Sequence, residues 1–336
     1  MVRHTIESQF VAGLTALRRR RAGLTTPHAR RGTSLAVTPI MRSCVAVCFV
    51  LAACGPGPGA PSEPGGGGET IDAAKGSGSH PSHEVVVMAI PELPGSRLFV
   101  RPDAVPAPGI LMLHGSEGGS APYIDDDARP LAEAGFAVVT FCWFGCPGRP
   151  DRIYQIPLEH TLVGLAWLRA SEAVGGRRVG LYGVSRGAEQ AVLLASLAPG
   201  AMNAVGVHAP SDTIVASYDP ATMDGVYEYD QASGQWIFAA AWTWQNAPLY
   251  GEKTSFGQAG PRIHVENYPA DLYLSHGVAD TLWPVQRSRN IKATRDAAGL
   301  PTEPHFWDGQ DHILMGAAAQ QFITTLTAFY HRTLDM

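Results

Sequence analysis

The sequence is poor in the features that mark nucleic-acid-binding proteins. Only 16% of its 336 residues are charged, and the formal net charge is −5. Residues 1–53 hold eight arginines and one acidic residue, so the rest of the chain has a clear excess of acid. Because an acidic surface repels phosphate backbones, this charge balance argues against a nucleic-acid partner.

The usual motifs of metal and cofactor binding are also missing. There is no H-E-x-x-H, no cysteine pair set against a histidine pair, and no nicotinamide or flavin fingerprint. The run Gly65–Gly68 does not read as a phosphate loop, because no strand is predicted before it and no helix after it. We therefore expect neither a metal nor an organic cofactor.

The N-terminal part lacks an apolar run of the roughly 20 residues that a membrane-spanning helix needs. In residues 41–54 a positive charge is followed by a short apolar run and then by small residues. This layout is typical of a secretory signal peptide. The ending Leu51-Ala52-Ala53-Cys54 resembles the lipobox of bacterial lipoproteins, which implies cleavage before Cys54 and acylation of its sulfur. A buried apolar helix that ends in cysteine is the alternative.

The segments around this signal predict an exported, lipid-anchored protein of the bacterial cell envelope, in the periplasm or outer membrane. Residues 54–83 are dominated by glycine, proline and serine, a composition typical of a disordered tether. Residues 1–40 fit neither the signal nor a domain. We interpret them as a non-native extension that results from a start-site error, with Met41 as the true start; a long basic extension is the alternative.

Only two of the five cysteines would remain in the folded body. Cys44 and Cys48 would leave with the signal, and Cys54 would carry the lipid. An even pair in an oxidising compartment favours a disulfide between Cys142 and Cys146. Two buried thiols are the alternative at this stage.

Residues 84–336 predict one α/β domain. Strands are predicted over residues 84–90, 98–101, 109–114, 137–141, 178–182, 204–208, 271–275 and 304–307. Helices are predicted over residues 158–170, 186–197, 285–298 and 313–334. Apolar strands that alternate with helices indicate a mostly parallel central sheet with helices on both faces. The first two strands, with no helix between them, indicate an antiparallel edge, and residues 209–263 are expected to roof part of the site.

One motif points to a nucleophile. Gly183-Val184-Ser185-Arg186-Gly187 matches G-x-S-x-G and lies between a predicted strand and a predicted helix. Such a tight turn exposes the serine, and its glycines let neighbouring backbone come close. Ser185 is therefore the candidate nucleophile, and a glycine-rich turn with an idle serine is the alternative.

A serine nucleophile needs a base, and the base needs an acid that fixes its tautomer. In folds of this type the order is serine, acid, histidine. His312 follows the last predicted strand, where open α/β sheets place their sites. Asp280 lies in a loop between a predicted strand and a helix. The alternatives are a capping or surface role for His312 and a helix N-cap for Asp280, with Asp308 and Asp311 as rival acids.

The loop His114-Gly-Ser-Glu-Gly-Gly follows another apolar strand. The backbone amide of Ser116 or Glu117, together with that of Arg186, would form an oxyanion hole. An ordinary glycine loop is the alternative, and this is the least specific of the motifs.

These segments resemble the C-terminal domain of the acyl-CoA thioesterase / bile acid-CoA:amino acid N-acyltransferase family and, more widely, dienelactone-hydrolase-like α/β-hydrolases. The resemblance covers roughly residues 108–333. It is carried by the glycine loop above, Trp143-Phe-Gly, Gly180-Leu-Tyr-Gly-Val-Ser-Arg-Gly-Ala-Glu, Gly277-Val-Ala-Asp-Thr-Leu-Trp-Pro and Asp311-His312. It implies an α/β-hydrolase fold and a triad of Ser185, Asp280 and His312. The β-sandwich domain that precedes this domain in the family is missing here, and an exported protein would not meet CoA.

Three functions follow as hypotheses. The first is a serine hydrolase that cleaves a small-molecule ester or thioester through an acyl-enzyme. The second is an acyltransferase with the same triad and an amine or alcohol acceptor. The third is a non-catalytic binding lipoprotein that kept the fold.

Overall fold

The computed structural model describes residues 84–119, 122–222, 224–251 and 260–335. The predictions for residues 1–83, which concern the extension, the signal peptide, Cys54 and the linker, lie outside the described residues. Within the described ranges, no helix has the length and apolar character to cross a bilayer.

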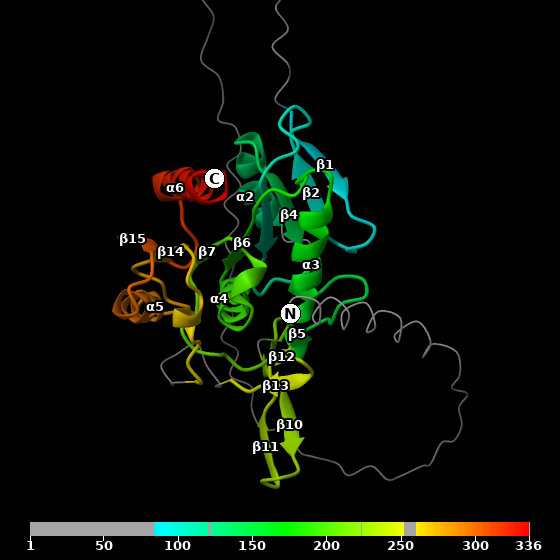
Figure 1. Ribbon diagram of the computed structural model, residues 1–336. Helices are drawn as coiled ribbons and strands as arrows, with labels where there is room; N and C mark the ends of the chain where they lie inside the picture. Colours follow the sequence, from blue (N-terminus) through cyan, green and yellow to red (C-terminus); the bar gives the residue numbers. More distant parts are fainter. Residues whose placement is uncertain (1–83, 120–121, 223, 252–259, 336) are drawn as a thin grey trace, which may run out of the picture. The chain divides into compact units, whose positions relative to one another are not determined.

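An eight-stranded sheet, ordered β1-β2-β4-β3-β6-β7-β14-β15, forms the centre of the fold (Figure 1). Strand β2 pairs antiparallel with β1 and β4, so the predicted antiparallel edge is confirmed, and all other neighbours in the sheet pair in parallel. The strands are β1 Val86–Ala89, β2 Arg97–Val100, β3 Gly109–Leu113, β4 Ala137–Phe141, β6 Val179–Val184, β7 Ala204–His208, β14 Leu272–Gly277 and β15 Thr302–Trp307.

Within the described residues, five helices cover the two faces of this sheet. Successive strand residues point to opposite sides, and both sides carry apolar side chains that the helices bury. Leu111 on β3 belongs to an apolar cluster with residues of α3 (Glu159–Ala170), α4 (Arg186–Leu197) and α5 (Gln286–Ala297). Its neighbour Ile110 belongs to a second cluster with α2 (Pro122–Glu133) and α6 (Ala317–Leu334). The sheet is therefore buried on both faces. The carboxyl ends of its parallel strands lie along one edge.

Two helices differ from the prediction. Helix α2 was not predicted, although Ile124, Ala128 and Leu131 are spaced along one face and are buried. Its three consecutive aspartates and Pro130 hide that period in the sequence. Helix α6 begins at Ala317 and not at residue 313, because Gly316 adopts a φ of +58° that ends the preceding loop.

Residues 209–263 contain short strands in place of the helix that the alternation would require. The elements are β8 Tyr218–Asp219, β9 Asp224–Gly225, β10 Tyr227–Asp230, β11 Gln235–Phe238, β12 Trp242–Trp244 and β13 Ala247–Leu249. The pairs β8–β9, β10–β11 and β12–β13 are antiparallel, and β12 also pairs in parallel with β5 (Ile156–Pro157). We call residues 209–249 the insert. Two 3-10 turns, η1 Pro199–Ala201 and η2 Val265–Asn267, complete the described elements.

Candidate active site

Ser185 occupies the turn between β6 and α4 and has a strained backbone, with φ of 54° and ψ of −119°. Few residues other than glycine adopt such a positive φ, so the surrounding structure must enforce it. The amide of Ser185 donates to the carbonyl oxygen of His208 on the next strand at 2.9 Å. A Cβ on Gly187 would lie 2.4 Å from the carbonyl oxygen of His114, so only glycine lets α4 begin this close to β3.

Three side chains that are far apart in the sequence meet at this turn. The Nε2 atom of His312 lies 2.9 Å from Oγ of Ser185, and its Nδ1 atom lies 2.7 Å from Oδ2 of Asp280. An ionised carboxylate only accepts hydrogen bonds, so Nδ1 carries the proton and Nε2 is free to accept one from the serine. This is the arrangement in which a histidine acts as a general base.

Asp280 is held as an anion by its surroundings. Its side chain is fully buried, and Oδ1 accepts the amides of Leu282 and Trp283, both at 2.8 Å. Burial alone would raise the pKa of Asp280, but hydrogen bonds from His276 and His312 outweigh it and hold the pKa well below its ordinary value. The carboxylate therefore stays negative and available to His312 at neutral pH.

The loops that carry Asp280 and His312 are locked together at the carboxyl end of β14. The amide of Ala279 donates to the carbonyl oxygen of Gln310 at 2.8 Å. A Cβ on Gly277 would lie 2.1 Å from the carbonyl oxygen of Asp311, so a larger residue would push the two loops apart. These contacts bring residues 280 and 312 together across 32 positions of sequence.

The rival acid Asp311 has other contacts. Asp311 accepts the amide of His312 at 2.7 Å and the amide of Thr281 at 2.8 Å, which tightens the loop rather than contacting the imidazole. Two other histidines near the C-terminus also have separate partners: His305 lies in β15 next to Glu303, and His331 lies in α6 next to Asp335. The geometry thus selects the same three residues as the sequence, and their catalytic role remains a proposal.

The predicted oxyanion residues lie beside this turn. The amide of Gly115 already has a partner, because it donates to the hydroxyl of Tyr123 at 2.6 Å. The next two amides along the loop are those of Ser116 and Glu117. Arg186 is the first residue of α4, where backbone N–H groups have no partner within the helix. The contact of Gly187 with His114 described above brings these two segments together. The structure supports the proposed oxyanion hole by this proximity alone.

The side chain of Arg186 has a role that the sequence did not reveal. It is buried and donates to Oε2 of Glu189 at 2.6 Å. Oε1 of Glu189 accepts the amide of Val215 and the indole N–H of Trp242, both at 2.9 Å. Burial raises the pKa of Glu189, and the Arg186 guanidinium opposes that effect. This buried ion pair fastens the insert to the helix that follows Ser185.

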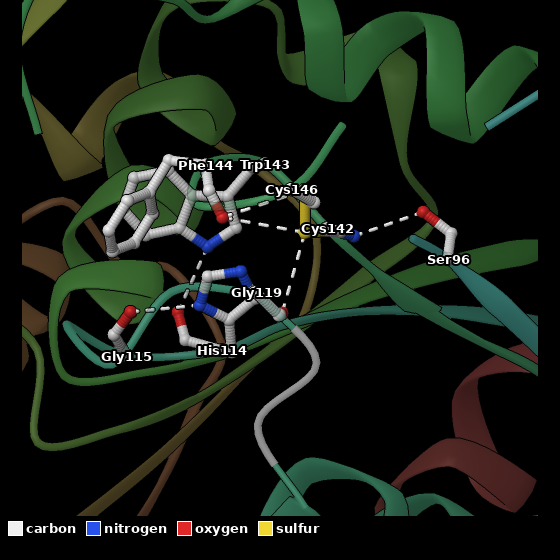
Figure 2. The surroundings of a disulfide bond; sticks show 8 residues. All are labelled: Ser96, His114, Gly115, Gly119, Cys142, Trp143, Phe144 and Cys146. Carbon is white, nitrogen blue, oxygen red and sulfur yellow. Dashed lines mark hydrogen bonds between the residues drawn. A yellow bond between two sulfur atoms is a disulfide. The ribbon is translucent and has the colours of Figure 1, made fainter. Parts of the chain in front are cut away.

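Cys142 and Cys146 form a disulfide near the glycine loop, with Cα atoms 6.4 Å apart (Figure 2). The amide of Cys142 donates to Oγ of Ser96 at 3.0 Å. Trp143, which lies between the two cysteines in the sequence, stacks on His114 with ring centroids 5.1 Å apart. Its indole N–H donates to the carbonyl oxygen of His114. Burial lowers the pKa of His114 to about 4, so this imidazole is neutral. The disulfide segment therefore supports the loop that holds the proposed oxyanion amides.

One surface groove lies apart from this site. A surface groove of about 690 Å³ at the β1–β2 edge is lined by Met88, Leu98 and Trp167 among others, and it shares no residue with the triad. In the part of the chain that the structure describes, no group of three or more histidine, cysteine or acidic side chains is placed to hold a metal ion.

The architecture is that of an α/β-hydrolase. Ferulic-acid-bound Est1E from Butyrivibrio proteoclasticus matches with a TM-score of 0.51 and 15% identity, over 71% of this chain and 94% of that one. An alpha/beta hydrolase enzyme from a Medee basin deep-sea metagenome library matches with a TM-score of 0.50 and 14% identity, over 75% and 98%. At these identities the likeness shows the fold alone, and it confirms the predicted fold class.

In sequence, the chain is similar to acyl-CoA thioesterases, as the motifs predicted. Mitochondrial acyl-coenzyme A thioesterase 2 of Mus musculus is 33% identical over 111 residues, which are 33% of this chain and 24% of that protein. Acyl-coenzyme A thioesterase 5 of Mus musculus is 32% identical over 120 residues, 36% of this chain and 28% of that protein. The match spans about a quarter of these relatives. No family model matches the sequence.

Proposed function

We propose that this protein is a serine hydrolase that cleaves an ester or thioester through an acyl-enzyme. The observation that carries the proposal is the continuous chain of hydrogen bonds from Ser185 through His312 to Asp280. It lies at a strained strand–helix turn, where α/β-hydrolases expose their nucleophile. The similarity to acyl-CoA thioesterases supports acyl transfer to water as the type of reaction.

The proposed mechanism has two halves. Oγ of Ser185 attacks the substrate carbonyl carbon while Nε2 of His312 takes the hydroxyl proton, and the backbone amides of Arg186 and Ser116 or Glu117 stabilise the oxyanion. The tetrahedral intermediate then collapses, and His312 returns the proton to the departing alcohol or thiol. In the second half, water takes the place of the alcohol or thiol, loses a proton to His312 and attacks the acyl carbon. The bond from that carbon to Oγ of Ser185 then breaks, His312 returns the proton to Oγ, and the acid is released. Asp280 stabilises the imidazolium in both halves.

A fluorophosphonate probe tests this mechanism directly, because it reacts with activated serines. We expect labelling of the folded protein, loss of labelling in Ser185→Ala and in His312→Ala, and retained labelling in the matched control Ser233→Ala, which changes an exposed serine of the insert. Labelling that persists in Ser185→Ala would place the nucleophile elsewhere. An absence of labelling and of turnover on an ester and thioester panel would favour a non-catalytic binding protein.

Product analysis separates hydrolysis from transfer to another acceptor. We expect the free acid as the product whether or not glycine or taurine is present. An amide product that grows with the amine concentration would assign the protein to the acyltransferases, with the same three residues in the same roles.

We also propose that the protein is exported and anchored by lipid at Cys54, on the strength of the lipobox-like sequence and the disulfide in the folded body. Metabolic labelling of a bacterial host with a clickable fatty acid tests this. We expect the label on the wild type and on Cys48→Ser, and its loss from Cys54→Ser. Equal labelling of the two variants would contradict the anchor and leave the proposed chemistry untouched.

A further inference from the structure

Besides His312, two buried histidines contact the proposed triad, and neither has a role in the mechanism above. His276 is the fifth residue of β14, and its side chain is fully buried. His208 ends β7 and is also buried. They contact different parts of the triad, so their roles can be separated by experiment.

The hydrogen bonds of His276 fix its protonation pattern. Its Nε2 atom lies 3.0 Å from Oδ2 of Asp280 and 2.9 Å from the carbonyl oxygen of Trp283. Both oxygens only accept hydrogen bonds, so Nε2 must carry a proton. Its Nδ1 atom lies 2.7 Å from Oγ of Ser288 on α5, whose hydroxyl can donate to it. His276 is thus oriented from one side by α5, and its single Nε2–H group is shared between the Trp283 carbonyl oxygen and Oδ2 of Asp280.

Both oxygens of the Asp280 carboxylate have polar partners. Oδ1 accepts two backbone amides, whereas Oδ2 is shared between two imidazoles, His312 at 2.7 Å and His276 at 3.0 Å. Two donors on one oxygen divide its negative charge between them. The strength of the bond from Asp280 to His312 therefore depends on His276.

We infer that His276, oriented by Ser288, is a positioning residue of the triad that holds Oδ2 of Asp280 and limits how strongly this oxygen stabilises the protonated form of His312. The inference rests on the proposed function, because it assigns the acid and base roles of Asp280 and His312. It extends that function by a chain of polar contacts from Ser288 through His276, Asp280 and His312 to Ser185.

The inference predicts a change in the pH dependence of catalysis. Without His276, Oδ1 stays bound to its two amides while the charge on Oδ2 acts on His312 alone. The imidazolium of His312 is then more stable, and a higher pH is needed to produce the neutral base. The titratable and charged groups around the carboxylate are His276 on β14, His208 on β7, His312 and Asp311 in the loop before α6, and Arg287 of α5 over the Trp283 ring.

His208 provides a matched control. Its Nε2 atom donates to the carbonyl oxygen of His312 at 3.0 Å, and its Nδ1 atom lies 2.9 Å from Oγ of Ser275. Burial lowers the pKa of His208 to about 3, so this imidazole is neutral over the range of an activity assay. It supports the backbone of His312 without a hydrogen bond to the Asp280 carboxylate. Its loss should weaken catalysis equally at every pH.

The experiment compares kcat/KM from pH 5 to pH 9 in the wild type, His276→Leu, His276→Gln and His208→Leu, with thermal unfolding of each. For His276→Leu we expect the acid limb of the kcat/KM profile to move to higher pH by about one unit. On that limb a shift of one pH unit corresponds to about a tenfold loss of kcat/KM near pH 6. At the alkaline plateau the loss should be much smaller. His276→Gln, whose amide can still donate to Oδ2, should restore the wild-type limb, and His208→Leu should leave the limb unmoved.

A purely structural role for His276 predicts a different result. If activity in His276→Leu falls by the same factor at every pH, or if His276→Gln does not restore the limb, the inference is overturned. Nitrogen-15 NMR of labelled histidines follows the titration of His312 in the folded protein without any substrate. If no ester or thioester is cleaved, the proposed function fails, whereas the NMR comparison of wild type and His276→Leu still decides whether His276 shares the carboxylate.

Discussion

The body of the central sheet and its carboxyl edge are buried alike but differ in chemistry. In the body, Leu111, Leu181 and Val205 are fully buried and contact other apolar side chains. At the edge, Ser275 and His276 are equally buried, yet each has hydrogen-bond partners. Burying a polar group is unfavourable unless it is hydrogen-bonded. The body therefore stabilises the fold by apolar burial, whereas the edge keeps polar groups because partners from several loops converge there.

The largest effect that this contrast predicts is at the edge. Ser185→Ala should lower kcat by roughly 10⁶-fold while leaving the melting temperature close to that of the wild type, because it removes the attacking oxygen and almost no packing. Steady-state kinetics with an ester substrate and thermal unfolding measure both. Substantial remaining activity would show that the edge chemistry does not depend on this serine.

Asp280→Asn should lower kcat by about 10⁴-fold, because an amide cannot fix the tautomer of His312 or stabilise its charge. The same variant tests a link to stability. The folded-state pKa of Asp280 is lowered, so the ionised carboxylate stabilises the fold above its ordinary pKa of about 3.9, and this contribution is lost as pH falls toward the folded-state value. The difference in unfolding free energy between wild type and variant should shrink from pH 6 to pH 3. A constant difference would contradict the lowered pKa.

Glu189 tests whether the edge and the insert depend on each other. Glu189→Gln keeps the side-chain volume but leaves the buried Arg186 charge without its partner, so the free energy of unfolding should fall by about 3–5 kcal/mol. Urea unfolding measures this loss. Asp296→Asn, which breaks the exposed Lys292–Asp296 pair, is the matched control and should change it by less than about 1 kcal/mol. Similar losses in the two variants would mean that the buried pair does not fasten the insert.

The smallest effect on catalysis is expected in the body. Leu181→Ala should lower the free energy of unfolding by about 2–5 kcal/mol through a cavity. The folded fraction should keep its kcat/KM, because Leu181 pairs with Leu111 and Val205 within the sheet and packs in the apolar cluster. Val163→Ala, on the exposed face of α3, is the control for both readouts. A large loss of kcat/KM in folded Leu181→Ala would erase the distinction between body and edge.

Much of the fold could be predicted because local patterns carry it. The eight apolar runs at the predicted positions form the eight strands of the sheet, with bounds that shift by a few residues. The helix from Arg186 to Leu197 was predicted at its observed bounds. The short strands of the insert were not predicted, since their pairing joins residues such as Trp242 and Ile156 whose relation no local period reveals.

By itself the sequence determined the order of the eight sheet strands and of the helices other than α2, the G-x-S-x-G turn and the choice of Ser185, Asp280 and His312 as the residues to bring together. Only the tertiary structure decided what surrounds them. No pattern in the sequence assigned a role to His276 or Glu189, and their importance comes from the atoms that face them, Oδ2 of Asp280 and the guanidinium of Arg186. The physical reason is that hydrophobic periodicity is encoded over a few neighbouring residues, whereas the partner of a buried polar group is set by how distant segments pack.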